Sequence, residues 1–329
     1  MIPFSILDLS PVVEGGDVST SLANSRALAQ AGERLGYNRF WLAEHHGMQG
    51  IASAATSVVI GHVAAGTSKI RVGAGGIMLP NHAPLLIAEQ FGTLAALHPG
   101  RIDLGLGRAP GSDGVVAQAM KRDLYAAAER FPADVQELMS YFAGSGPVRA
   151  VPGEGEDVPV WILGSSLYGA QVAAHFGLPY AFASHFAPTH MHEAIRIYRE
   201  RFQPSERLKK PYVMLGYNVV AAETDEEAQF LSTSLLQAFV NLGRGTPGRL
   251  PRPVEGYEKD LPPDARARLS GMLSASAIGS ADTVANTIAS FIEKTGADEL
   301  ILSASVHDFE KRIRSYEIAA DVHARLAAV

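Results

Sequence analysis

The chain has 329 residues, of which 47% are hydrophobic and 19% are charged, and it contains no cysteine. That length is sufficient for one large domain with a sizeable core. The lack of cysteine excludes disulfides, thiolate zinc sites, iron–sulfur clusters and a cysteine nucleophile. The 28 basic and 34 acidic residues give a net charge of −6, with no run of five like charges. We therefore expect no nucleic-acid partner.

Membrane association is not expected either. The most apolar long stretch, residues 51–65, is interrupted by polar side chains and is too short to span a bilayer. The first ten residues carry no positive charge ahead of their apolar run, unlike a secretory signal. We therefore expect a cytoplasmic protein with no membrane partner.

Short apolar segments alternate with longer segments of helical periodicity along the whole chain. Strands are predicted at 4–9, 40–43, 70–74, 101–106, 160–163, 180–183, 212–220 and 299–303. Helices are predicted at 20–35, 54–65, 87–94, 135–142, 172–176, 191–202, 225–240 and 283–294, with a last helix running to the end. About eight strand–helix units without an internal linker predict a single domain, residues 1–329, with a (β/α)₈ barrel. A doubly wound open sheet is the alternative that the same alternation allows.

Two segments are predicted to be loops. Residues 144–159 are rich in glycine, proline and acidic residues, and residues 243–263 contain four glycines and five prolines. A loop as long as 243–263 within a compact domain is usually a functional cover or a solvent loop. We expect this Gly/Pro-rich insertion to be a mobile cover over the site.

Polar clusters follow five consecutive predicted strands, where a (β/α)₈ barrel places its active site. Each cluster alone is a weak signal, but their common placement predicts one broad site. The clusters are Glu44-His45-His46, Gly75 to His82, Gly107 to Asp113, Gly164-Ser165-Ser166 and Ser184-His185-Phe186.

Several of these residues also have ordinary structural interpretations. The pair Gly75-Gly76 is compatible with a tight turn, and Arg108 with a surface ion pair. Ser165 or Ser166 is suited to cap the following helix, and a helix start beside a glycine is also an anion site. Neighbouring side chains at a strand end diverge, so one of His45 and His46 should face the barrel mouth.

Two rival classes fit poorly. The segment 105–111 is one residue too long for a dinucleotide-binding G-x-G-x-x-G turn, and it contains Pro110. The His190-Met-His192 pair does not follow the first strand, where a barrel metallohydrolase would place it, and no H-E-x-x-H is present. We therefore expect no metal site.

Four stretches together resemble the bacterial luciferase-like flavin monooxygenase family over essentially the whole chain. They are Trp-Leu-Ala-Glu-His-His at 41–46, Gly-Gly-Ile-Met-Leu-Pro-Asn-His at 75–82, Gly-Arg-Ala-Pro-Gly at 107–111 and Gly-Ser-Ser at 164–166. The resemblance implies a (β/α)₈ barrel, reduced FMN as co-substrate, and oxidation of a small organic substrate by O₂. It also implies a homodimer. Because no nicotinamide fingerprint is present, reduced flavin is expected from a separate flavin reductase.

The resemblance also assigns residues to roles. His45 matches the catalytic histidine, Arg108 the arginine that holds the flavin phosphate, and Ser166 a serine that assists it, while Gly169 would add a backbone N–H. Gly75–Gly76 lies where the family often has a non-proline cis peptide beneath the flavin ring. Two departures stand out: Gly107 replaces a reactive cysteine, and Ser165 replaces an acidic residue near the phosphate. Light emission is therefore not expected.

Two alternatives remain open. One is an F420-dependent oxidoreductase that transfers hydride on the same barrel, and the other is a non-catalytic flavin-binding protein. If the flavin reading holds, the apolar residues Ile77, Met78, Leu79 and Phe186 could exclude water from the site.

Overall fold

Eight parallel strands close into a barrel in the computed structural model, which describes residues 1–109, 114–120 and 123–328. Strands β1 to β7 pair in chain order, β7 pairs with β9, and β9 returns to pair with β1. The predicted (β/α)₈ barrel is confirmed, and the open sheet is wrong because the β9–β1 ladder closes the circle. The strands are β1 Phe4–Asp8, β2 Arg39–Leu42, β3 Arg71–Met78, β4 Ile102–Gly107, β5 Val160–Gly164, β6 Tyr180–Phe182, β7 Val213–Ala221, β8 Ser276–Gly279 and β9 Glu299–Ser303.

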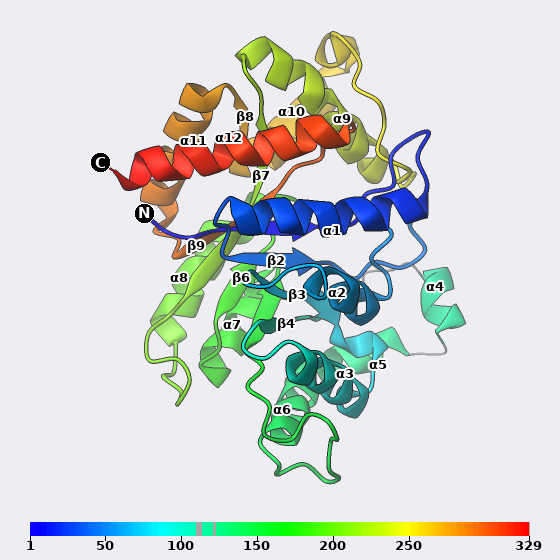
Figure 1. Cartoon of the computed structure of the whole chain (residues 1–329), viewed down its shortest axis with the longest axis vertical. Helices are drawn as coiled ribbons and strands as arrows, with labels where there is room; N and C mark the ends of the chain where they lie inside the picture. The colour runs from blue at the N-terminus through cyan, green and yellow to red at the C-terminus, as the bar shows by residue number, and fades with distance from the viewer. Residues whose placement is uncertain (110–113, 121–122, 329) are drawn as a thin grey trace.

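The helices surround this barrel, and the long α1 and α12 lie next to one another across the view in Figure 1. The predicted helices are all present, whereas α4, α5 and α10 were not predicted. Their bounds are α1 Val18–Arg34, α2 Thr56–Ala64, α3 Pro84–Leu97, α4 Gly114–Ala119, α5 Leu124–Glu129, α6 Phe131–Phe142, α7 Leu167–Phe176, α8 Met191–Arg201, α9 Asp225–Gly243, α10 Pro263–Met272, α11 Ala281–Thr295 and α12 Phe309–Ala327.

Local capping explains where three of the long helices begin. The side chain of Asp17 accepts a hydrogen bond from the Thr20 N–H, and Thr224 and Asp308 play the same part for α9 and α12. Each cap satisfies an N–H group that the first helical turn leaves without an internal partner. Each helix then buries one apolar face against the barrel.

Strand β8 is the one strand among the described residues that was not predicted from the sequence. It pairs with residues 218–221 of β7, along the same edge where β6 pairs with residues 213–215. Because β6 is only three residues long, β8 extends the sheet along the rest of the nine-residue β7. The barrel wall therefore changes partner at Gly216 and Tyr217, close to the mouth.

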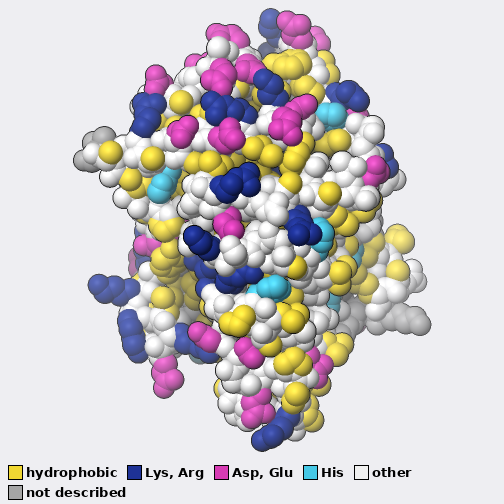
Figure 2. Space-filling view, viewed as in Figure 1, with side chains coloured by type: hydrophobic (Ala, Val, Ile, Leu, Met, Phe, Trp, Pro, Cys, Tyr) yellow, Lys and Arg dark blue, Asp and Glu magenta, His cyan; other side chains and the backbone are white. Residues whose placement is uncertain are grey.

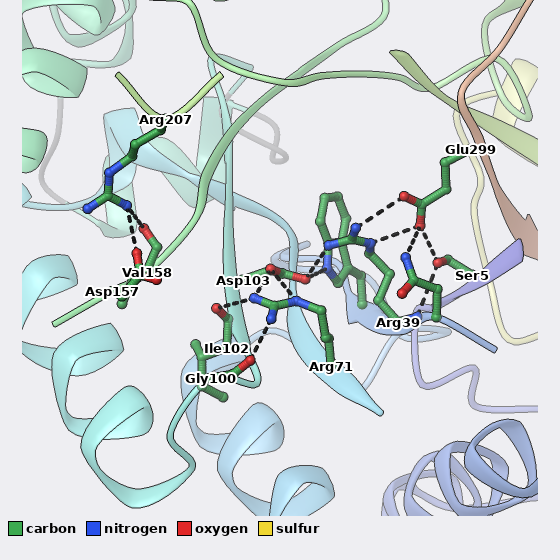
Figure 3. Close-up of polar contacts among 12 residues, drawn as sticks. Ser5, Arg39, Arg71, Gly100, Ile102, Asp103, Asp157, Val158, Arg207 and Glu299 are labelled. Carbon is green, nitrogen blue, oxygen red and sulfur yellow. Dashed lines mark hydrogen bonds and ion pairs between the residues drawn. The ribbon is translucent and has the colours of Figure 1, made fainter. Parts of the chain in front are cut away.

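The interior of the barrel separates into an apolar middle and a charged floor. The middle is formed by the inward side chains of alternate strand residues, which are Leu7, Trp41, Ala43, Trp161, Ala181, Met214 and Ile301. At the floor, Arg39 lies between Asp103 and Glu299 at 2.8 Å from each, and Arg71 holds the other side of Asp103 (Figure 3). Ser5 also donates to Glu299. All of these residues stand at or near the starts of their strands, at the end of the barrel opposite the site, where side chains serve stability rather than chemistry.

Replacing Glu299 with glutamine should lower the free energy of unfolding by about 3–5 kcal/mol, because Arg39 would keep a buried charge with one ionic partner fewer. Urea unfolding at pH 7 measures this. Glu200→Gln is the matched control, since the Glu200–Arg196 pair is exposed and such pairs contribute about 0–1 kcal/mol. Equal losses in the two variants would contradict a structural role for the charged floor.

The Gly/Pro-rich insertion largely lacks regular structure, as predicted, although α9 runs to Gly243 and a 3₁₀ turn occupies Tyr257–Asp260. It is nevertheless anchored. Leu250 exchanges backbone hydrogen bonds with Val12 and Glu14, and Gly248 lies against Gly50. The segment therefore packs on the loops that follow β1 and β2, at the mouth end of the barrel.

The surface gives two further facts. Figure 2 shows acidic and basic side chains mixed over the upper part of the face in view, where α12 lies. No helix among the described residues is both long and apolar enough to cross a membrane.

Candidate functional site

The chain beyond β2 is extended, so the side chains of Glu44, His45 and His46 point alternately to its two faces. The Glu44 N–H donates to the Gly76 carbonyl at 3.2 Å, so the strand geometry continues past Leu42. Successive side chains of an extended chain point to opposite faces. Glu44 and His46 therefore share one side, and His45 points with Trp41 and Ala43 toward the barrel axis.

Glu44 is a buried carboxylate that organises one wall of the mouth. It accepts hydrogen bonds from the Met78 N–H at 2.9 Å and the Asn81 amide at 3.0 Å, and it contacts His46 Nε2 at 2.7 Å and His82 Nε2 at 2.9 Å. Burial alone would raise the pKa of Glu44, but these bonds outweigh it and hold the pKa below its ordinary value. No role was predicted for Glu44, although its spacing of two from His46 in the sequence indicates a shared face.

His45 has the opposite environment. Its Nδ1 is buried and has no hydrogen-bond partner. Burial lowers the pKa of His45, and Glu44 only partly offsets that effect. The imidazole is therefore largely neutral at pH 7, with one nitrogen free to accept a proton and the other carrying one.

Gly75 and Gly76 lie inside β3 rather than in a turn after it, so the tight-turn interpretation is wrong. The β3–β4 register shifts between Ala74 and Ile77, which makes the glycine pair a bulge. The bond between them is a cis peptide. A Cβ on Gly76 would lie 2.7 Å from the Gly105 carbonyl oxygen. The two strands can approach this closely only because no side chain stands between them.

Arg108 is brought to the start of α7. Its guanidinium carbon lies 4.2 Å from the centre of the Tyr168 ring, and its Nε donates to the Ala128 carbonyl at 3.2 Å. Half-buried Arg108 thus packs on the first turn of α7 and forms no ion pair with any residue that the structure describes.

The start of α7 has the features of an anion site. Ser166 occupies the N-cap position, but its side chain makes no capping hydrogen bond. Ser165 precedes it half-buried, and Gly169 is the third residue of the helix. The first-turn N–H groups and the helix dipole favour an anion here, and Arg108 adds a full positive charge. These residues fit a phosphate group, as the flavin reading requires.

The expected apolar wall is wrong in part. Ile77 and Leu79 are fully or almost fully buried in the larger core between barrel and helices, and Phe186 is 45% exposed. The outward side of β3 is covered by helices, so apolar residues there pack outward rather than toward the mouth.

A histidine that the sequence analysis gave no role completes the mouth. His185 follows β6, its Nδ1 is buried without a partner, and its ring lies over Gly216 of β7. Among the described residues, no group of three or more His, Asp or Glu side chains is arranged to hold a metal ion.

Solved structures with low sequence identity to this chain share its fold. A type II Baeyer–Villiger monooxygenase component from Pseudomonas putida, solved with FMN, is 17% identical with a TM-score of 0.71, and covers 97% of this chain and 96% of its own. An F420-dependent secondary alcohol dehydrogenase is 14% identical with the same TM-score, and covers 96% and 97%. At these identities the likeness bears on the fold alone.

Two other relatives combine nearly full coverage with much higher sequence identity. An Escherichia coli K12 protein named luciferase-like monooxygenase is 49% identical over 328 residues, which are 99% of this chain and 98% of that one. The solved structure of apo-MsnO8 is 36% identical with a TM-score of 0.92, and covers 98% and 99%. The family model for luciferase-like monooxygenases matches residues 2–299. The chain therefore belongs to the luciferase-like monooxygenase family.

Proposed function

We propose that this protein uses reduced FMN and O₂ to oxidise a small organic substrate. The observation that carries the proposal is the stack of Arg108 on Tyr168 at the open N-terminus of α7. An arginine fork and free helix N–H groups suit the phosphate of a mononucleotide. Ser165, Ser166 and Gly169 would hold the phosphate with Arg108, and Gly75–Gly76 would lie beneath the ring.

The chain's own residues would then supply proton control and shielding. Bound reduced flavin provides the electrons that activate O₂, while the protein positions and protects the reacting groups. His45 holds or releases a proton at its free ring nitrogen. Glu44 holds one wall of the mouth in place through its contacts with His46, His82 and Asn81.

We further propose that a separate flavin reductase supplies the reduced cofactor and that the protein works in the cytoplasm as a homodimer. The poor dinucleotide match at residues 105–111 supports the separate reductase, since the chain offers no nicotinamide fingerprint there.

Cofactor titration tests the proposal. FMN and F420 are added separately to the purified protein while the absorbance of each is followed. We expect a saturable change with FMN, and substrate-dependent oxygen uptake once the flavin is reduced. Tight binding of F420 alone would instead support hydride transfer on this barrel. Binding of FMN without any substrate-dependent oxygen uptake across a panel of small organic compounds would support a non-catalytic flavin-binding protein.

The insertion 243–263 is expected to cover the site when flavin is bound. Trypsin can cleave after Arg244, Arg249 and Lys259, none of which precedes proline. Cleavage should be slower with saturating FMN, because covers of this kind open more often in the unliganded protein. Equal rates with and without flavin would leave the segment as a solvent loop anchored to the β1 and β2 loops.

A further inference from the structure

His45 and His185 reach the barrel mouth from opposite walls. His45 follows β2 and His185 follows β6, and these strands are four positions apart in a closed circle of eight. Met214 belongs to the inner apolar cluster, so Gly216, two residues further along β7, also faces the interior. A Cβ on Gly216 would lie 2.1 Å from His185 Nδ1. The imidazole therefore lies over the inner face of β7, in space that only glycine leaves free.

The backbone of His185 is held firmly while its ring nitrogen is not. The Asn218 amide donates to the His185 carbonyl at 2.6 Å and also to Ser276 Oγ at 3.2 Å. The Ser184 hydroxyl donates to the Gly216 carbonyl at 2.7 Å. Despite these anchors, Nδ1 of His185 is shielded from solvent and has no partner, as is Nδ1 of His45. An unpartnered buried nitrogen in a native protein requires an explanation, and both of these nitrogens belong to side chains that face the mouth.

Neighbouring charges affect the pKa values of His45 and His185 differently. Burial is the larger cause and the charge of His45 the smaller one, and together they lower the pKa of His185 to about 4. Burial also lowers the pKa of His45. The Glu44 carboxylate raises that pKa, and the His46 charge lowers it. Among the described residues, Glu44 and His46 are the titratable groups that act on His45, and His45 is the one that acts on His185. A first proton is therefore stabilised on His45 by Glu44, and a second proton on His185 is disfavoured by the first.

We propose that His45 and His185 form one acid–base unit across the barrel mouth that holds a single proton, with His45 as its carrier and His185 as a neutral positioning residue. When the unit takes up a proton, one N–H bond forms on His45 and the positive charge stays there. His185 keeps one N–H and one lone pair throughout. The use of this proton in oxidation rests on the proposed function, whereas the pairing of the two rings does not.

Histidine NMR on the full-length protein without cofactor tests the pairing directly. The ring resonances of ¹³C,¹⁵N-histidine-labelled protein are followed with pH and assigned by substituting His45 or His185 with glutamine. In the wild type, His185 should not titrate between pH 8 and pH 5. In His45→Gln the midpoint of His185 should rise, since the opposing charge is gone. In His62→Gln, which removes an exposed histidine of α2 away from the mouth, the midpoint of His185 should stay where it is.

A second variant keeps the inference testable if His45→Gln is poorly folded. Gly216→Ala places a methyl group where the His185 ring lies, so the ring should move out and titrate closer to its ordinary pKa. Gly271→Ala in α10 is the control, because a Cβ there meets nothing within 4 Å. A wild-type His185 that titrates near pH 6.5, or one that ignores both His45→Gln and Gly216→Ala, would overturn the pairing. Neither result depends on FMN binding. The proposed function is tested separately, by cofactor titration and oxygen uptake, so the failure of one proposal can be told from the failure of the other.

Discussion

Replacing Arg108 with alanine should weaken FMN binding by roughly 30-fold to several thousand-fold. Removing one side of a buried, charge-assisted contact typically costs about 2–5 kcal/mol. The fold should be retained, because the contacts of Arg108 among the described residues are with the Tyr168 ring and one carbonyl of α5. Flavin fluorescence titration gives the two dissociation constants, and thermal unfolding confirms that the variant is folded.

Two further substitutions separate charge from geometry at this position. Arg108→Lys keeps the charge but loses the planar fork and the stacking on Tyr168, so its affinity should lie between wild type and Arg108→Ala. Arg149→Ala removes an arginine whose side chain is 83% exposed and should leave FMN affinity unchanged. An Arg108→Ala protein that binds FMN as tightly as wild type would remove Arg108 from the phosphate site.

The barrel itself was readable from the sequence because its signals are local. Residues 160–163 and 299–303 are short apolar runs, and they match β5 and β9 within one residue. Strand β3 extends four residues beyond its predicted end because the glycine pair indicates a turn when only neighbouring residues are considered. Strand β8 was missed because Ser-Ala-Ile-Gly contains a single large apolar residue, and its place depends on the length of β7.

The site likewise has features that follow from local sequence and features that depend on residues distant in sequence. The divergence of His45 and His46 follows from strand alternation, and the same alternation places Glu44 on the side of His46. The placing of His185 depends on Gly216, which is distant in sequence and has no side chain to mark the contact. The stack of Arg108 on Tyr168 likewise joins the end of β4 to the start of α7. Contacts of this kind arise only when the barrel closes.

His45→Ala should bind FMN nearly as well as wild type but oxidise substrate about 10²–10⁴ times more slowly, the usual cost of losing a general acid–base group. The ring of His45 faces the mouth with its Nδ1 unpartnered, so its removal breaks no hydrogen bond at that nitrogen among the described residues. Oxygen uptake should continue without product, and hydrogen peroxide should account for the oxygen consumed. Parallel assays of product, oxygen and peroxide measure this uncoupling.

His46→Ala supplies the comparison within the same cluster. His46 contacts the buried Glu44 carboxylate at 2.7 Å, so its loss should lower stability and disturb the wall that Glu44 organises. Turnover by the folded fraction should fall much less than in His45→Ala, because His46 lies on the opposite side of the chain from the barrel axis. If His46→Ala abolished oxidation while His45→Ala did not, the roles of the two histidines would be reversed, and the proton would have to be carried on the Glu44 side of the mouth.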